Sequence, residues 1–303
     1  MKVAIAGASG MVGKALTRYL KKGGHLVTAL KRNENGGADN AFVDVTPEFL
    51  QKFDAVINLA GENIAGKRWS DKQKKLIVDS RVNTTSFLAK TLSQTIGSPA
   101  VFINASAVGI YGNRGDEELD EQSAHGSGFL AGTCKQWEDA TKEAKRADLR
   151  VVLARLGVVL NKDGGALNKM LLPFQLGAGG VLGSGRQYMS WIASDDVISA
   201  FAFLLENNVE GPVNLTAPQP ATNAEFTNTM AKVLHRPAIL PAPAFGLKLL
   251  LGDMAQEMLL EGNRVLPTKL QNAGFKFDYA NLEKAITHEL NPALTDYVAS
   301  TTK

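Results

Sequence analysis

Three glycines, Gly7, Gly10 and Gly13, are spaced three residues apart near the start of the chain. They follow a predicted strand at 3–6 and lead into a predicted helix at 14–22. A loop in this context can bind phosphate groups, because a helix N-terminus offers free N–H groups and a partial positive charge. The first glycine makes the turn, the second admits a pyrophosphate to the backbone, and the third packs helix against strand. We therefore favour a dinucleotide site over an ordinary glycine-rich turn.

The end of the second predicted strand, 25–30, indicates which dinucleotide would fit. Lys31 and Arg32 follow this strand, and no acid occurs before Glu34. Sites for NAD usually place an acid here, whereas a basic residue accommodates the 2′-phosphate of NADP. Arg32 is the better candidate, since a guanidinium can bind phosphate in two-pronged fashion; a solvated basic turn is the alternative. The predicted cofactor is NADP(H), with NAD(H) less favoured. Asp44 either accepts from the adenine amino group or is a plain surface residue.

Other reactive side chains give weaker signals. The four histidines have no ligand spacing, so no metal site is predicted. Ser106 has no His-Asp pattern near it, which argues against a hydrolase triad. Cys134 is either a reactive thiolate or, as is more common within a helix, a small buried hydrophobe. Trp69 and Trp191 either stack on a ligand ring or pack in the core.

Short apolar segments alternate with helical stretches along much of the chain. The predicted strands are 3–6, 25–30, 41–44, 54–59, 100–105, 150–156 and 212–215. The predicted helices are 14–22, 71–95, 128–146 and 194–206. The strands are continuously apolar, which is typical of strands buried on both faces. We predict an α/β fold, a Rossmann-type doubly wound parallel sheet with a smaller C-terminal substrate lobe.

The regular alternation ends near residue 157, where glycines and then prolines become frequent. We expect a dinucleotide-binding Rossmann domain over 1–157, to which later segments return. A mainly C-terminal substrate-binding lobe is expected over 158–303.

The composition narrows the class of partner. The chain has 303 residues, of which 45% are hydrophobic and 21% charged, as in ordinary globular proteins. The net charge of +3 comes without a Lys/Arg block, so no nucleic acid is expected. No stretch approaches the ~20 apolar residues of a membrane span, and no signal peptide is recognised. The single cysteine fits a reducing compartment, and a cytoplasmic location is predicted.

Several segments together carry a resemblance to a known family. They are the glycine loop, the strand end at 58–61, the helix start at 195–197, and the segments 61–69, 183–188 and 264–270. With them the chain resembles the extended short-chain dehydrogenase/reductase superfamily. It looks like an atypical branch of epimerase-family proteins, often described as nucleoside-diphosphate-sugar epimerases and sometimes given a cell-division-inhibitor label. The resemblance covers nearly the whole chain, and the last three segments are specific to that branch.

The resemblance implies roles for particular positions. Those implied for cofactor binding are Gly7, Ser9, Gly10, Met11, Val12, Ala60, Gly61, Glu62 and Arg155, besides Lys31, Arg32 and Asp44. Ser106 would be the substrate-facing catalytic serine, with Tyr111 in the same loop as a second catalytic candidate. Asn63 and Arg186 would contact a small-molecule substrate that carries an anionic group. Homo-oligomer formation is left open.

The chain departs from the superfamily at one helix. Ordinary members carry a Tyr-x-x-x-Lys pair, whose lysine lowers the tyrosine pKa so that the phenol can exchange a proton. None of the five tyrosines here has a lysine four residues on. Aligning Glu138 with the acid that often follows the pair puts Leu130 at the tyrosine position and Cys134 at the lysine position. Leu130 cannot transfer a proton, and Lys135 is rotated about 100° away on the helix.

Two residues are candidates to replace the missing pair. Tyr111 could supply the phenol, or could simply pack and hydrogen-bond in the core. Glu62 could act as a base if burial raised its pKa, or could be a hydrogen-bond acceptor.

Two functions stay open on the sequence. One is an NADP-dependent epimerase, reductase or dehydratase that acts on a nucleotide-sugar or similarly anionic substrate. The other is a non-catalytic or regulatory NADP(H)-binding protein. The missing pair favours the second, whereas the loops around Ser106 and Arg186 favour the first.

Overall fold

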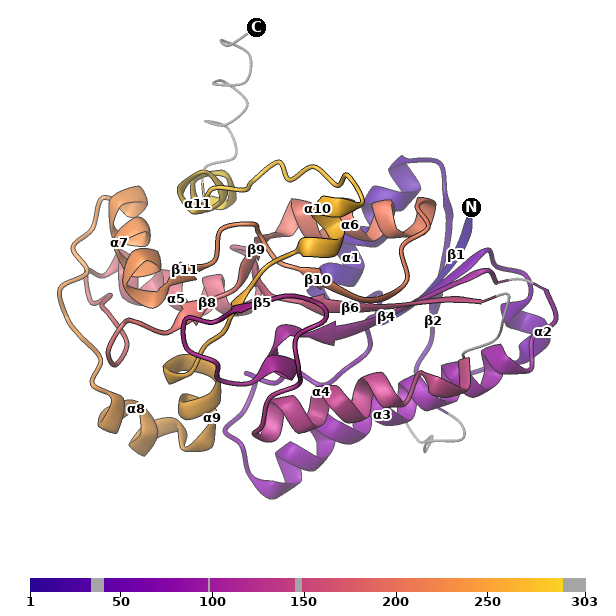
Figure 1. The fold of residues 1–303 in the computed structure, drawn as a ribbon, viewed down its shortest axis with the longest axis horizontal. Coiled ribbons are helices and arrows are strands. Elements are labelled where there is room, and N and C mark those ends of the chain that lie inside the picture. Colours follow the sequence, from indigo (N-terminus) through magenta and orange to yellow (C-terminus); the bar gives the residue numbers. More distant parts are fainter. Residues whose placement is uncertain (34–40, 98, 145–148, 291–303) are drawn as a thin grey trace, which may run out of the picture. The chain divides into compact units, whose positions relative to one another are not determined.

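The computed structural model describes residues 1–33, 41–97, 99–144 and 149–290. The chain forms two compact units, coloured along the sequence in Figure 1. The first unit comprises Met1–Ile110, Phe129–Arg155 and Ile198–Val213. The second comprises Tyr111–Gly128, Leu156–Val197 and Asn214–Lys303.

A six-stranded sheet forms the centre of the first unit. Its strands are β1 (Lys2–Ala6), β2 (Leu26–Leu30), β3 (Ala55–Asn58), β4 (Val101–Ala107), β6 (Arg150–Leu156) and β10 (Gly211–Leu215). The spatial order is β10-β6-β4-β3-β1-β2, so β1 lies between β2 and β3. The pairs β1–β2, β1–β3 and β3–β4 are parallel. Six of the seven predicted strands are these six, and the predicted Rossmann-type α/β fold is confirmed.

Helices connect and cover these strands. They are α1 (Met11–Lys22), α2 (Pro47–Leu50), α3 (Asp71–Ser93), α4 (Phe129–Asp139) and α6 (Ser194–Glu206), with 3-10 turns at Val108–Tyr111 and Lys142–Ala144. Helix α3 begins at a Ser70 N-cap, whose side chain accepts from the Gln73 amide at 3.2 Å. Figure 1 shows α3 and α4 lying side by side along one face of the sheet.

The prediction of a strand at 41–44 is wrong. This segment makes only an isolated antiparallel bridge, Arg32 to Phe42, rather than joining the parallel sheet. The Val43 amide donates to the Lys31 carbonyl at 2.9 Å, so the chain turns back on the end of β2. Asp44 then has a φ of 56°, in the left-handed region, and this conformation ends the extended backbone.

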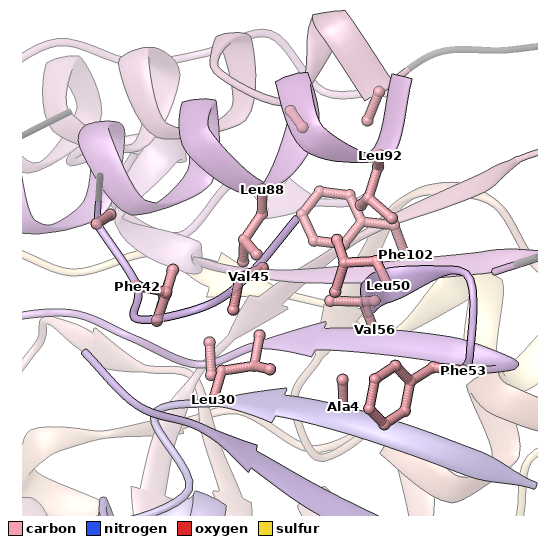
Figure 2. Packing of buried hydrophobic residues seen from close by; sticks show 14 of the residues in the cluster. Ala4, Leu30, Phe42, Val45, Leu50, Phe53, Val56, Leu88, Leu92 and Phe102 are labelled. Atoms are coloured by element: carbon pink, nitrogen blue, oxygen red, sulfur yellow. The ribbon is translucent and has the colours of Figure 1, made fainter. Parts of the chain in front are cut away.

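A buried cluster holds α3 and the 42–53 segment on the sheet (Figure 2). Leu88 and Leu92 of α3 lie close to Phe102 of β4 and Val56 of β3 in this cluster. Phe42 joins it as well, with 2% of its surface exposed. Full burial of such a side chain stabilises a fold by about 1.5–3 kcal/mol. Packing therefore sets α3 firmly against β3 and β4, where candidate site residues are found.

The second unit contains shorter elements. Its strands are β5 (Glu118–Leu119), β7 (Val158–Leu160), β8 (Tyr188–Met189), β9 (Trp191–Ala193), β11 (Ala221–Thr222) and β12 (Arg264–Val265). Its helices are α5 (Gly165–Gln175), α7 (Asn223–Leu234), α8 (Ala244–Leu251), α9 (Asp253–Ala255), α10 (Thr268–Asn272) and α11 (Leu282–Leu290), with a π-helical turn at Gln256–Leu260. Its core gathers Trp191, Leu167, Phe226 and Ile286. Helix α7 begins with a capping box between Thr222 and Glu225.

Candidate functional site

The glycine loop connects β1 to α1, and its three glycines have different surroundings. Gly7 has a φ of +78°, and a Cβ there would lie 2.6 Å from the Leu59 carbonyl carbon. A Cβ on Gly13 would lie 2.2 Å from the Gly7 oxygen, so no side chain fits at either position. A Cβ on Gly10 would meet nothing closer than the Gly7 oxygen at 3.4 Å. Gly7 and Gly13 are therefore required by packing, whereas Gly10 leaves space on the outer side of the loop.

Helix α1 presents its N-terminus to that space. Gly10 is the N-cap residue and has no side chain to cap the helix, and the first turn contains no acid. The first i to i−4 bond runs from the Lys14 amide to the Gly10 oxygen at 2.9 Å. The N–H groups of Met11 and Val12 precede it and keep the partial positive charge of a helix start. Ser9 is exposed beside them. This arrangement can hold an anion such as phosphate.

A small pocket of about 90 Å³ adjoins Arg32. Its walls come from the end of β2 and the returning segment, the residue after Gly61, and α3; they are Arg32, Asn33, Ala41, Glu62, Leu76, Asp79, Ser80, Asn83 and Thr84. Among the described residues that form these walls, Arg32 is the one cation. Asp79 is paired with Lys75 at 2.7 Å. Lys31 and Asp44 are exposed and are not among the described residues that form these walls.

A buried polar network supports the loop that follows β3. Asn58 and Asn104 are register partners on β3 and β4, and the Asn58 Nδ2 donates to Asn104 Oδ1 at 2.7 Å. The Asn58 Oδ1 accepts from the Ala60 amide at 3.1 Å, which orients Ala60–Glu62. Thr85 accepts from Asn58 and from the Trp137 indole, both at 3.0 Å. The sequence analysis did not predict this network. An Asn within each of two apolar strands could have indicated it, because a buried polar side chain needs a hydrogen-bond partner.

Ser106, Glu138 and Arg155 meet in a buried cluster, supplied by β4, α4 and β6. Arg155 donates to both Glu138 carboxylate oxygens, from Nε at 2.8 Å and from Nη2 at 2.9 Å. The Ser106 hydroxyl donates to Glu138 Oε1 at 2.7 Å. The three residues are 1%, 8% and 2% exposed in that order. Both predicted residues are therefore engaged with Glu138, which the sequence identified only as an alignment marker.

The face of α4 that carries Leu130, Cys134 and Glu138, here called the α4 face, has no exposed acid–base group at its centre. Cys134 is 4% exposed. Burial, reinforced by the negative charge of Glu138, raises the pKa of the Cys134 thiol to about 12. The thiol is therefore protonated at neutral pH and is a buried small side chain rather than a reactive thiolate.

Tyr111 lies in the second unit and is completely buried. Its hydroxyl donates to Asn214 Oδ1 at 2.7 Å. Asn214 is held in turn, since its backbone N–H donates to Glu121 Oε1 at 3.0 Å. Of the two readings of Tyr111, this environment matches a hydrogen-bonded core residue.

The remaining candidates lie on loops. Asn63 is exposed, and its Oδ1 accepts from the Ala65 amide at 3.0 Å, which shapes the turn after β3. Arg186 is exposed in the second unit, and its amide donates to Ser184 Oγ at 3.3 Å. Trp69 and Trp191 are both buried, and their indoles donate to the Ile64 and Gln219 carbonyls.

The sheet order and the glycine loop at its switch point define a Rossmann-type protein. A model of the NAD dependent epimerase/dehydratase family matches residues 3–216, and the chain belongs to this family. Residues 242–289 match a domain of unknown function, DUF1731. The resemblance to epimerase-family proteins that the sequence indicated is confirmed.

Three similar proteins are informative. Epimerase family protein Mb2239 of Mycobacterium bovis is 43% identical over 94% of this chain and 96% of its own length. The crystal structure of human epimerase family protein SDR39U1 (isoform 2) with NADPH has 35% identity and a TM-score of 0.87, over 96% of this chain and all of that one. The nucleoside-diphosphate sugar epimerase of Corynebacterium glutamicum has 34% identity and a TM-score of 0.79, over 99% of this chain and 61% of that one.

Across the described parts of the chain, no group of three or more His, Cys, Asp or Glu side chains is arranged to hold a metal ion. Within the same residues, none of the helices combines the length and the apolar character needed to cross a membrane.

Proposed function

We propose that this chain is an NADP(H)-binding, epimerase-like protein. The observation that carries the proposal is the pocket beside Arg32 at the end of β2, together with the glycine loop that follows the neighbouring strand β1 and is open at Gly10. A dinucleotide laid across β2 and β1 would put its 2′-phosphate at Arg32, with Lys31 nearby. The similarity to the human protein solved with NADPH supports the same cofactor.

The residues present fit such a cofactor. Ser9, Gly10, Met11 and Val12 would bind the pyrophosphate through backbone N–H groups at the start of α1. The segment Ala60–Glu62, held by Asn58, would line the half of the cofactor beyond the pyrophosphate. When bound, a nicotinamide supplies hydride transfer, and the protein supplies binding and orientation.

The first test is a titration of the purified chain with NADPH and NADH, followed by nicotinamide fluorescence. We expect NADPH to bind more tightly, and Arg32→Ala to weaken NADPH about tenfold or more while leaving NADH nearly unchanged. Arg18→Ala on the exposed face of α1 is the matched control and should behave as the parent. Equal affinity for both cofactors would refute the role of Arg32. Binding of neither would refute the cofactor.

For the catalytic alternative, the substrate would be a nucleotide-sugar or similarly anionic small molecule. Ser106 and Tyr111 are the catalytic candidates, with Asn63 and Arg186 as substrate contacts. The substrate class is supported by the similarity to the C. glutamicum nucleoside-diphosphate sugar epimerase.

A second candidate, a non-catalytic or regulatory NADP(H)-binding protein, is favoured by the state of the hydroxyl and thiol groups. The hydroxyls of Ser106 and Tyr111 donate hydrogen bonds to Glu138 and Asn214. The Cys134 thiol stays protonated. Incubation of the NADPH complex with a panel of nucleotide-sugars separates the two functions. Oxidation of the nicotinamide, or interconversion of sugars without net redox, would establish an enzyme. Tight cofactor binding with neither reaction would support the regulatory role.

A further inference from the structure

Exposed apolar side chains are distributed unevenly between the two units. Among the described residues, thirteen large hydrophobic side chains are exposed, and the six in the first unit come from separate segments. The other seven lie in two segments of the second unit, each 56–77% exposed. We call these seven the apolar patch; they are Leu172, Leu176, Ile239, Leu240, Phe245, Leu249 and Leu250.

Backbone pairing joins the two segments of the apolar patch. The chain that follows α5 runs parallel to the chain that leads into α8, through an isolated bridge between Leu182 and Ala242. In the same pairing, the Leu240 N–H donates to the Gly179 oxygen at 3.3 Å. Because the two segments are parallel, the C-terminal end of α5 lies toward Leu240, and α8 leads away from their other end. The apolar patch therefore extends from the end of α5 to α8 (Figure 1).

Helix α8 is apolar except for Lys248, yet none of its eight residues is buried. Phe245 and Leu249 are one turn apart and form the outer stripe of the helix, where each is 77% exposed. Leu247 and Leu251 lie on the opposite side of the helix and are half-buried. A helix that is hydrophobic all round is normally covered on all sides. The composition of α8 therefore predicts that another apolar surface covers its outer stripe.

The size of the apolar patch matches one half of a protein–protein interface. At about 100 Å² of apolar surface for each side chain, the patch exposes roughly 700 Å². The largest patch on a typical monomer is about 300–600 Å², whereas a stable interface buries about 800 Å² on each partner. A two-fold symmetric dimer uses the same surface on both copies, so this patch can supply both halves of one interface.

The charges that accompany the apolar patch are positive. The segments 164–183 and 235–252 contain no Asp or Glu, and their basic residues are Lys169, His235, Arg236 and Lys248. All four are exposed, as is usual for the polar rim of an interface. Two copies joined through the patch would bring like charges near each other at the rim. Because salt screens such repulsion, the interface would have a characteristic salt dependence.

We propose that the apolar patch binds a second copy of this chain in a two-fold symmetric dimer. Helix α8 and the end of α5 are covered by the same elements of the partner, and removal of their apolar side chains from water drives the association. The basic residues stay at the rim, where they oppose association weakly. The inference concerns the assembly of the chain and does not depend on the cofactor proposed above.

Analytical ultracentrifugation over about 1–100 µM protein tests the proposal. We expect the parent chain to dimerise with a dissociation constant of about 10 µM or below. Leu249→Glu and Leu172→Glu should each weaken the dimer about a hundredfold or more, because each buries two unpaired carboxylates in the interface. Ile96→Glu makes the same change at an exposed apolar residue of the first unit, and this control should dimerise as the parent does. Circular dichroism should show the same fold for all four chains, since the replaced side chains are exposed.

Salt separates a second copy from an anionic bilayer as the occupant of the patch. Raising the salt from about 50 mM to about 500 mM should tighten the dimer severalfold, whereas binding to phosphatidylglycerol vesicles would weaken. A parent chain that stays monomeric at about 100 µM would overturn the inference, whether or not it binds the vesicles. A dimer that either glutamate variant of the patch leaves intact would overturn it too. So would a dimer that salt weakens, because attraction between opposite charges would then hold the copies together.

Discussion

The glycine loop and the α4 face border the same sheet but differ in what they require of the sequence. At the loop, the backbone itself makes the site. Gly7 and Gly13 are required because a Cβ added there would lie 2.6 Å and 2.2 Å from backbone atoms. At the α4 face the site depends on side-chain chemistry. There Leu130 and a protonated Cys134 occupy the positions that align with the Tyr-x-x-x-Lys pair. Glu138, one turn further along α4, forms a buried ion pair with Arg155.

The comparison teaches that a site made by backbone geometry and a site made by side-chain chemistry tolerate different substitutions. A loop made by backbone geometry is lost only when packing fails, whereas an acid–base pair is lost by single substitutions that the fold tolerates. The buried ion pair between Glu138 and Arg155 joins α4 to β6, a strand inside the sheet.

The largest effect should come from the ion pair. Glu138→Gln leaves the Arg155 guanidinium buried without a countercharge, and we expect a loss of about 3–5 kcal/mol in the free energy of unfolding. Urea denaturation followed by circular dichroism measures it. The double variant Glu138→Leu/Arg155→Met should recover most of the loss, because no buried charge remains. Unchanged stability in the single variant would show that the pair is not buried as described.

A smaller effect should distinguish two glycines of one loop. Gly13→Ala pushes a methyl group into the Gly7 carbonyl, and we expect about 1–3 kcal/mol of destabilisation. Gly10→Ala meets no such contact and should alter stability by only about 0.5 kcal/mol. It should nevertheless weaken NADPH binding, since its methyl group occupies the space proposed for the pyrophosphate. Thermal melts with and without NADPH report both quantities, and similar melts for the two apo variants would contradict the packing argument.

The smallest effect concerns the reactivity of Cys134. Because burial raises its pKa to about 12, only about one thiol in a thousand is ionised at pH 9 in the folded protein. Alkylation by iodoacetamide, followed by mass spectrometry, should stay slow up to that pH. The chain has no other cysteine, so the denatured protein is its own control, and its thiol should react rapidly above about pH 8.5. Fast alkylation of the native form would restore the thiolate as a catalytic candidate.

Much of the fold was predictable because buried parallel strands are short, apolar and regularly spaced. The segments 3–6, 54–59 and 100–105 were recognised on this basis, and the helix at 194–206 has the predicted bounds. The prediction of a strand at 41–44 was wrong because these apolar residues belong to a turn. Phe42 of this turn packs in the core, and Asp44 bends the backbone. A local pattern cannot distinguish these two uses of apolar residues.

The candidate site was predictable where the backbone carries the signal. The glycine spacing and Arg32 at the end of β2 could be read directly. The partners of Ser106 and Arg155 could not, because Glu138 is 32 residues from the first and 17 from the second.

The sequence by itself determined the family, the order of the strands along the chain, the glycine loop and the absence of a Tyr-x-x-x-Lys pair. These are properties of residue type and spacing, which act locally. Only the tertiary structure decided that Cys134 is protonated and that Glu138 binds Arg155. The physical reason is that burial and pairing set the state of a charged or ionisable group, and both arise from residues far apart in the chain.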